Sequence, residues 1–452
     1  MASAEISAEQ VTDLIHTLLE QEDQAGLAEL VNALPLSQAL RELANLLPEQ
    51  RDAVLTLLPP ELAAELIYEA PNEFAVDLVE RLEATQAAHI IEELNSDVQA
   101  DVIGEMALEE AEAILAQMDP DEAADVRRLV EYENETAGGL MVAETFTFTP
   151  TDEVGKVLRW MANDDDFERY RGQHPYVVDE EGRPIGVVSL RGLLTSRRES
   201  LLADVMTSPV TVPVNLALND LQDLFDKHPF LGLPVVESDE RLVGVVARGA
   251  VDAAALERAT ADSLKQQGVV GDELRSMPVA VRSRRRLAWL SANIVLNIIA
   301  ASVISAYEET LAAVIAIAVF LPMVSDMSGC SGNQAVAVTM RELALGLTRP
   351  RDALRVWRKE VVVGLINGVA LGLLIGLVAW VWRGNPYLGL VIGIALALNT
   401  LIAVSIGGVV PLFLKRFGQD PAVASGPLLT TVTDMAGFFL VLSLATLFLP
   451  LL

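Results

Sequence analysis

The chain has 452 residues, enough for several domains, and its charge is divided very unevenly. Residues 287–452 hold eight acidic and nine basic side chains, so the other 55 acidic and 23 basic side chains give residues 1–286 a net charge of −32. So negative a region repels polyanions, which argues against nucleic acid and favours divalent cations as partners, although ordinary surface solubility is the alternative explanation.

Residues 1–135 consist of short helical segments that repeat about every 12 residues. Leu34-Pro35, Leu47-Pro48 and Leu58-Pro59 mark successive units, and VDLVERLEA (76–84) is a typical short amphipathic helix. Because short helices bury a core only by stacking, the pattern predicts an α-helical superhelix. The polar, acidic start MASAEISAEQ lacks the apolar core of a secretory signal, so we expect this end in the cytoplasm.

Two related units follow, at 174–198 and 230–254. Each has the pattern of a strand, a turn, a second strand and a helix, and each is preceded by a helical run, at 152–162 and 216–227. The duplication indicates a paired α/β regulatory module. The sequence holds no nucleophile–base set, phosphate-binding loop or His/Cys metal motif, so we do not expect an enzyme.

The last part of the chain is typical of a five-helix, all-α membrane domain. Uncharged runs cover 287–307, 361–382 and 384–414, while 310–340 and 421–452 hold one acid each. About 20 apolar residues suffice to span a membrane. The glycines and the proline of FLPMVSDMSGCSGNQAVAVTMREL (320–343) predict a kinked or broken second span, and close helix packing on these small residues is the equal alternative.

Basic residues predict the orientation of these spans. They cluster at 282–286, 349–359 and 415–416, whereas the opposite loops hold one arginine, Arg383. The positive-inside rule therefore predicts a multi-pass inner-membrane protein with a cytoplasmic N-terminus and an external C-terminus.

The acids within the spans are candidates for a cation pathway. A carboxylate at the bilayer centre costs a few kcal/mol unless it faces a partner or water. Asp434, beside three threonines, is the main candidate, and a protonated or paired structural acid is the alternative. Asp326 either lines the path near the outer water or caps a helix. Cys330 is expected to fill space.

Several motifs resemble the MgtE family of magnesium channels and transporters, including its cystathionine-β-synthase (CBS) domains. They are ENETAGGLM (133–141), GNQ (332–334), RKEVVVGL (358–365) and SGPLLTTVTDMAG (425–437). The resemblance implies four parts. These are an acidic helical-repeat domain (1–135), tandem CBS domains (136–252), a connecting, plug-like helix (253–286) and a pore domain (287–452).

The resemblance also implies a homodimer with the pore between its subunits, lined by the second and fifth spans. Asp434 of each subunit would hold a largely hydrated Mg²⁺, helped by the backbone carbonyl of Thr430. Asn333 of the GNQ motif and Asp326, which departs from the family pattern, are further candidate ligands. Asp262 would be a regulatory ligand. Mg²⁺ prefers few carboxylates and retained waters, which agrees with this set. Because family members often carry glycine and asparagine in place of Asp326 and Cys330, other divalent ions such as Mn²⁺ or Co²⁺ stay open.

The resemblance also implies that the cytoplasmic part senses Mg²⁺ through acidic side chains, and several of these are replaced in this sequence. The connecting segment GAVDAAALERATAD (249–262) has few of the expected acids, and Asp164, Asp165 and Asp166 are alternative ligands. Ser189 is the one candidate nucleotide contact. Gly192 and Ala250 stand where nucleotide-binding CBS units carry ribose-binding acids, so ATP and AMP are not expected as ligands.

We therefore predict a divalent cation channel or transporter, with Mg²⁺ as its first candidate ion. The ion enters the cytoplasm down its electrochemical gradient, and the acidic CBS region gates it. The expected partners are the ion, a second copy of the chain and membrane lipid. Two alternatives stay open: a Na⁺- or H⁺-coupled exchanger, and a membrane-anchored CBS signalling protein.

Overall fold

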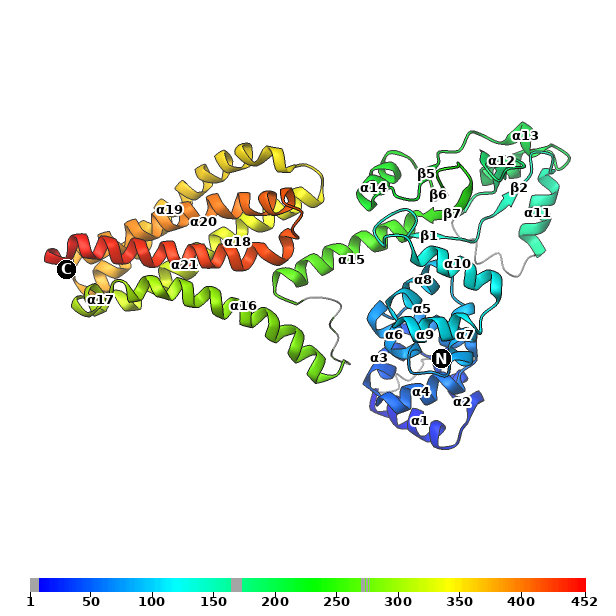
Figure 1. Ribbon diagram of the computed structural model, residues 1–452, viewed down its shortest axis with the longest axis horizontal. Helices are drawn as coiled ribbons and strands as arrows, with labels where there is room; N and C mark the ends of the chain where they lie inside the picture. The colour runs from blue at the N-terminus through cyan, green and yellow to red at the C-terminus, as the bar shows by residue number, and fades with distance from the viewer. Residues whose placement is uncertain (1–7, 164–172, 270–272, 274, 276) are drawn as a thin grey trace, which may run out of the picture. The chain divides into compact units, whose positions relative to one another are not determined.

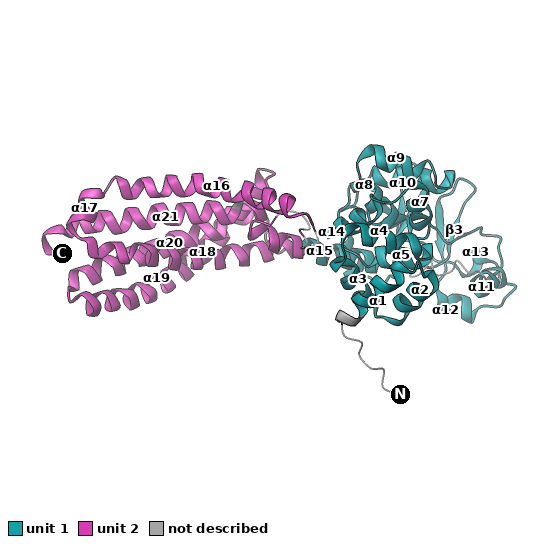
Figure 2. Ribbon diagram, turned by 90° about the horizontal axis from the view of Figure 1, so that it is seen from below, with its two compact units in different colours: residues 1–258 teal, residues 259–452 magenta. Residues whose placement is uncertain are grey.

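The computed structural model describes residues 8–163, 173–269, 273, 275 and 277–452. It forms two compact units, Met1–Arg258 and Ala259–Leu452, which are coloured separately in Figure 2. The predicted fold class is confirmed: a helical N-terminal domain, a pair of α/β units and five long apolar helices. Asp164, Asp165 and Asp166 lie outside the described residues.

The N-terminal domain is a stack of short helices (Figure 1). They are α1 (Ala8–Glu20), α2 (Gln24–Ala33), α3 (Leu36–Asn45), α4 (Pro48–Leu57), α5 (Pro60–Tyr68), α6 (Asn72–Val79), α7 (Ala84–Glu92), α8 (Ser96–Glu105), α9 (Leu108–Leu115) and α10 (Pro120–Val130). From α3 to α10 each helix begins 12 residues after the previous one, which confirms the predicted repeat. Proline stands at the N-cap or first position of α3 to α6, where its fixed φ suits a helix start and its missing N–H is not needed.

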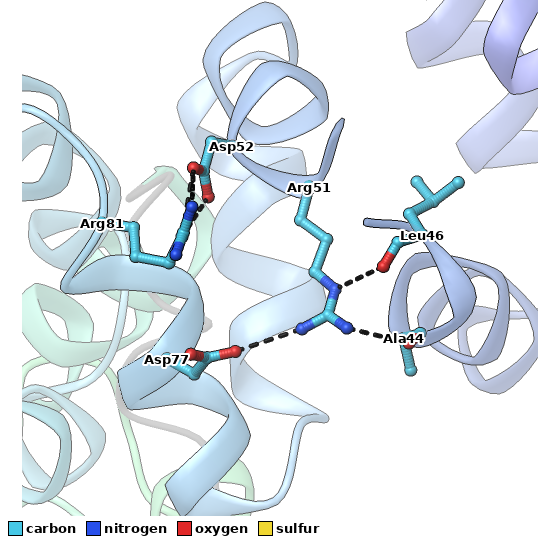
Figure 3. A network of polar contacts seen from close by, with 6 residues as sticks. All are labelled: Ala44, Leu46, Arg51, Asp52, Asp77 and Arg81. Carbon is cyan, nitrogen blue, oxygen red and sulfur yellow. Dashed lines mark hydrogen bonds and ion pairs between the residues drawn. The ribbon is translucent and has the colours of Figure 1, made fainter. Parts of the chain in front are cut away.

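A buried arginine ties neighbouring helices of this stack together (Figure 3). Arg51 of α4 is only 5% exposed, and its guanidinium donates at 3.1 Å to the carbonyls of Ala44 and Leu46 at the end of α3. The same group donates at 3.1 Å to the Asp77 carboxylate of α6. The otherwise unpaired carbonyls at the end of α3 are thereby satisfied, and α3, α4 and α6 are held in register.

The two α/β units have the same strand plan. The first contains β2 (Thr147–Phe148), α11 (Val154–Asn163), β3 (Tyr176–Val178), β4 (Pro184–Val187), α12 (Leu190–Thr195) and α13 (Leu202–Val205). The second contains β5 (Val212–Pro213), α14 (Leu218–Lys227), β6 (Gly232–Val236), β7 (Leu242–Ala247) and the start of α15 (Arg248–Gln266). In each, a strand pairs in parallel with the next across a helix, and that strand then pairs antiparallel with the third. β1 (Met141–Val142) adds to the edge of the second sheet at β7.

The membrane unit contains five helices long and apolar enough to span a bilayer. These spans are Val279–Ser305, Ile315–Ala344, Pro350–Arg383, Pro386–Arg416 and Pro421–Leu451. Their elements are α16 (Val279–Ser305), η2 (Ile315–Val319) with α18 (Leu321–Ala344), η3 (Pro350–Asp352) with α19 (Ala353–Arg383), α20 (Pro386–Arg416), and α21 (Pro421–Phe448) with η4 (Leu449–Leu451). α17 (Glu308–Ala313) lies between the first two spans.

Two details differ from the sequence-based expectation. The second span is not broken in its Gly-Cys-Ser-Gly segment, because α18 runs unbroken from Leu321 to Ala344 and the irregular backbone precedes it at Val314 and Phe320. The connecting segment 253–286 is not one helix, since α15 ends at Gln266 and α16 begins at Val279.

Glycines let the spanning helices approach one another closely. A Cβ on Gly368 of α19 would lie 2.6 Å from the Ala397 carbonyl oxygen, and one on Gly372 would lie 2.5 Å from that of Gly393. Gly332 of α18 faces Gly407 of α20 in the same way. Gly332 of the second span therefore serves close helix packing, as small residues often do in membranes.

We expect Gly407→Ala to destabilise the membrane unit, because the new Cβ would overlap the backbone oxygen of Gly332. Overpacking against backbone costs about 1–3 kcal/mol, which a lowered thermal unfolding midpoint in detergent measures. Gly329→Ala is the matched control, since its Cβ would meet only the Thr433 hydroxyl at 3.8 Å. Equal midpoints for the two variants would contradict the packing role.

Candidate functional site

A polar pocket of about 520 Å³ opens in the membrane unit between α18 and α21. Its lining comes mostly from these two helices, with one residue each from α16 and η2. The lining residues are Ile304, Ala318, Leu321, Pro322, Ser325, Asp326, Gly329, Cys330, Asn333, Thr430, Thr433, Asp434 and Phe438. Oxygen-bearing side chains are thus gathered in a region that is otherwise apolar.

Asp434 lies midway along α21 and is half-buried. Its carboxylate accepts a hydrogen bond from the Ser325 hydroxyl of α18. A hydroxyl donor stabilises the charged carboxylate, so Ser325 offsets part of the desolvation of this acid.

Three other predicted ligands share this pocket with Asp434. Asp326 and Asn333 lie seven residues apart on α18, about two helical turns, and both side chains are exposed. Thr430 lies one turn before Asp434, and its carbonyl oxygen accepts a hydrogen bond of 3.0 Å from the Thr433 hydroxyl. Inside a continuous helix this carbonyl also accepts the backbone N–H four residues on, so the Thr433 hydroxyl competes with a hydrated ion for it.

The remaining two predicted site residues lie elsewhere. Asp262 is on α15, where the Lys265 ammonium lies 3.9 Å from its carboxylate. Ser189 is the N-cap of α12 in the first α/β unit, and its hydroxyl accepts at 3.0 Å from the Gly192 backbone N–H. Neither residue belongs to the pocket.

A buried amide braces the pocket from behind. The Asn399 side chain of α20 is fully buried and donates at 3.1 Å to the Thr433 carbonyl of α21 and at 3.5 Å to the Val324 carbonyl of α18. Each of these carbonyls belongs to the residue just before a side chain of the site, because Thr433 precedes Asp434 and Val324 precedes Ser325. Asn399 therefore fixes the spacing of the two helices at the level of the Ser325–Asp434 hydrogen bond.

Sequence reasoning missed Ser325 and Asn399. Asn399 is an amide in the middle of the uncharged run 384–414, whose other amide, Asn385, stands at its start, and that central position was the available signal. Ser325 gave a weaker one, because serine often hydrogen-bonds its own helix, as Ser328 does with the Val324 carbonyl.

The ligand chemistry suits a hard divalent cation but is incomplete in one chain. Carboxylate, amide, hydroxyl and carbonyl oxygens are the ligands that Mg²⁺ and Ca²⁺ prefer. Among the described residues no group of three His, Cys, Asp or Glu side chains could hold a metal ion. Two carboxylates, Asp326 and Asp434, line the pocket, and water or a second chain has to supply the rest.

The five spans, the paired α/β units and the acidic pocket define a membrane transporter of divalent cations. A family of divalent cation transporters matches residues 321–444, the MgtE intracellular N domain matches 34–135, and CBS domains match 137–199 and 202–256. The magnesium transporter MgtE of Thermus thermophilus is 34% identical over 337 residues, which cover 73% of this chain and 74% of the relative. The chain belongs to the MgtE family of magnesium transporters, as the resemblance of its motifs predicted.

Solved structures match the N-terminal unit. The soluble part of a magnesium transporter has the same fold over 56% of this chain and all of its own, with a TM-score of 0.50 and 24% identity. The cytosolic domain of the Mg²⁺ channel MgtE, crystallised in complex with ATP, is 29% identical over 54% of this chain and 99% of its own, with a TM-score of 0.49.

We expect Asn399→Leu to loosen the pocket, because the carbonyls of Thr433 and Val324 would lose a buried donor. A typical hydrogen bond contributes about 0.5–1.5 kcal/mol, so both the unfolding midpoint and the ion flux should fall. Thr400→Val is the matched control, since the neighbouring Thr400 hydroxyl is buried without a hydrogen-bond partner among the described residues. A Thr400→Val variant as impaired as Asn399→Leu would contradict the brace.

Proposed function

We propose that the protein is a homodimeric Mg²⁺ channel in which Asp434 of each subunit faces a hydrated ion on a two-fold axis. The observation that carries this proposal is the position of Asp434, midway along an apolar helix and inside a pocket rich in oxygen ligands. Two carboxylates across a two-fold axis complement a divalent ion that keeps most of its water.

The polar face of the pocket supports the dimer. Asp326, Cys330, Asn333 and Thr430 are exposed together on one face of a bundle whose spanning helices are mostly apolar. A charged or amide side chain facing hydrocarbon is unfavourable, so this face needs water or a second protein surface over it. A second copy supplies both, because two such faces enclose a polar path between them.

We propose an inner-membrane location, with the acidic unit in the cytoplasm and the C-terminus outside. The basic clusters at 282–286, 349–359 and 415–416 support it through the positive-inside rule. An inside-negative potential favours entry of a divalent ion by about 4.6 kcal/mol per 100 mV, so passive flow inwards needs no energy source and no enzymatic step.

Two contacts support gating through α15. In the membrane unit, Lys265 near its end lies 3.1 Å from the Asp420 carboxylate, which caps α21 by accepting from the Ala422 N–H at 2.8 Å. Asp262 lies on the other side of the same lysine. We propose that displacement of α15 acts on α21, the helix of Asp434, through this lysine.

An acidic cluster in the N-terminal unit is the proposed cation sensor. Burial and the nearby Glu144 raise the pKa of Asp97 to about 6. Partial loss of water, with the charges of Asp97, Glu257 and Glu105, raises the pKa of Asp101 to about 7, although its side chain stays on the surface. Asp97 and Asp101 are on α8 and Glu257 is on α15, so a divalent cation here would relieve repulsion between two domains.

The proposed division of labour follows the four parts expected from the sequence, with boundaries at 135, 252 and 286. Nucleotides are not included. The expectation against ATP and AMP rests on Gly192 and Ala250, which replace the ribose-binding acids, and on the Ser189 hydroxyl, which caps α12. The related cytosolic domain that was crystallised with ATP argues against this expectation.

Asp434→Asn is the central test. The amide keeps the size of the side chain but removes the charge, so Mg²⁺ flux into liposomes should fall at least a hundredfold while the protein stays folded and dimeric. Flux is measured with a Mg²⁺ dye and an imposed inside-negative potential, with no Na⁺ or H⁺ gradient. Flux in the unmodified protein under these conditions would exclude the coupled exchanger and the signalling protein.

Asp326→Asn is the matched control, because it removes a carboxylate from the same pocket at an exposed position. A smaller loss of flux is expected, together with a change in the ratio of Mn²⁺ to Mg²⁺ transport. Unchanged Mg²⁺ flux in Asp434→Asn would refute the proposed ion path.

The acidic cluster predicts a pH-dependent response to Mg²⁺. A carboxyl with a raised pKa is protonated at pH 6 and ionised at pH 8, so repulsion in the folded unit grows as the pH rises through about 7. Mg²⁺ should therefore raise the thermal midpoint more at pH 8, and a several-fold higher concentration should be needed at pH 6. Asp101→Asn should reduce this difference, whereas Asp223→Asn, an exposed acid on α14, should not. An equal Mg²⁺ response at both pH values would contradict the sensor.

A further inference from the structure

A second groove in the membrane unit lies away from the pocket. It has a volume of about 590 Å³ and runs between the first turns of α19 and the last three turns of α20. Its lining consists of Pro350, Arg351, Ala353, Leu354, Trp357, Ser405, Ile406, Val409, Val410, Phe413 and Arg416. Neither helix contributes to the pocket of Asp434, so a second copy placed over that pocket does not need these helices.

The groove is apolar along its length and basic at one end. From Ser405 to Arg416 it follows α20 for about 16 Å, at 1.5 Å per residue. The side chains of Leu354 and Phe413 are 59% and 48% exposed in this groove. An empty apolar groove loses packing contacts, so an apolar molecule that fills it is favourable. Close to them in sequence, Val356 and Leu412 pack in a small buried cluster, against which the groove residue Ala353 also packs.

The basic end has two arginines without a counter-charge. Arg351 and Arg416 are exposed, and neither has an ion pair or a side-chain hydrogen bond with any residue that the structure describes. The nearest acid in sequence, Asp352, accepts a hydrogen bond of 3.0 Å from the Arg349 N–H and caps η3. Two guanidinium groups at the mouth of an apolar groove complement a phosphate that carries an acyl chain.

The position of the groove decides between the possible phosphate compounds. Arg351 starts the third span and Arg416 ends the fourth, so both lie where the helices leave the hydrocarbon. Trp357 lies between them and the apolar part, at the depth where tryptophan is enriched in membrane proteins. A soluble phosphate would leave the groove beneath the arginines empty, whereas a phospholipid fills both parts.

We propose that this groove binds an anionic phospholipid, with its headgroup phosphate between Arg351 and Arg416 and one acyl chain along Ile406, Val410 and Phe413. Basic pockets between spanning helices recognise acidic headgroups by this combination of charge and depth. The lipid would join the start of α19 to the end of α20, since both line the groove.

Native mass spectrometry of the full chain in detergent tests the proposal. Titration with dioleoylphosphatidylglycerol and with dioleoylphosphatidylcholine should give tighter binding of the anionic lipid. The double variant Arg351→Gln/Arg416→Gln should bind phosphatidylglycerol roughly 25-fold more weakly, about fivefold for each arginine, with little effect on phosphatidylcholine. Both substitutions are on the surface and should leave the protein folded.

Lys359→Gln is the matched control. Lys359 is two residues beyond Trp357 and thus about 200° around α19, so it removes one charge at the same end of the bundle without lining the groove. It should change the affinity for phosphatidylglycerol less than twofold. An equal loss for the control and the double variant would show a diffuse surface charge and overturn the site.

A second variant tests the apolar part. Val410→Trp should fill the groove and weaken the binding of both lipids, and inorganic phosphate at 10 mM, about a physiological level, should not displace phosphatidylglycerol. Displacement by phosphate would identify a phosphate site in place of a lipid site. Loss of the dimer in Val410→Trp would show that a second copy covers the groove, and either result would refute the proposal.

Discussion

The membrane unit is built around one constraint: Asp434 lies midway along an apolar helix, where a carboxylate is unstable unless polar groups surround it. Ser325 donates to it from α18, and the spacing of α18 and α21 depends on Asn399, whose amide reaches a carbonyl of each helix. Asn399 reaches them because α20 packs closely against α18 where Gly332 faces Gly407. A single acid on α21 thus accounts for a hydroxyl, a buried amide and a pair of glycines on the two neighbouring helices α18 and α20.

The N-terminal unit follows a different logic, in which negative charge is tolerated because it stays at the surface. The short helices repeat every 12 residues, and each turns its apolar side chains towards the core and most of its acids towards the surface. The buried Arg51 is satisfied by two backbone carbonyls and by Asp77. Loss of water, together with the charges of neighbouring acids, raises the pKa values of Asp97 and Asp101 on α8. Negative charge keeps the rest of this surface soluble, but around Asp97 and Asp101 it is a source of repulsion that bound cations or protons would reduce.

The sequence predicted those features that depend on local patterns. Helix breakers at regular steps predicted the stack, strand–turn–strand patterns predicted both α/β units, and long uncharged runs predicted the five spans. The unbroken α18 was not predicted, because glycine favours a kink and a close helix contact equally, and only the neighbouring backbone of Gly407 decides between them. The same holds for Asn399, since an amide in an apolar run does not reveal which carbonyls it meets.

Asp326 has consequences for ion choice that follow from charge and hydration. It lines the same pocket as Asp434, so two copies meeting over the pocket would bring four carboxylates around one path. A Mg²⁺ ion gives up its water reluctantly, so these carboxylates would stabilise it through its hydration shell by their negative charge. Ions that exchange water for carboxylate more readily, and that stand higher in the order of ligand affinity, gain more from each added oxygen ligand. An extra acid in the pocket therefore strengthens divalent binding in general and narrows the preference for Mg²⁺ over transition-metal ions such as Mn²⁺.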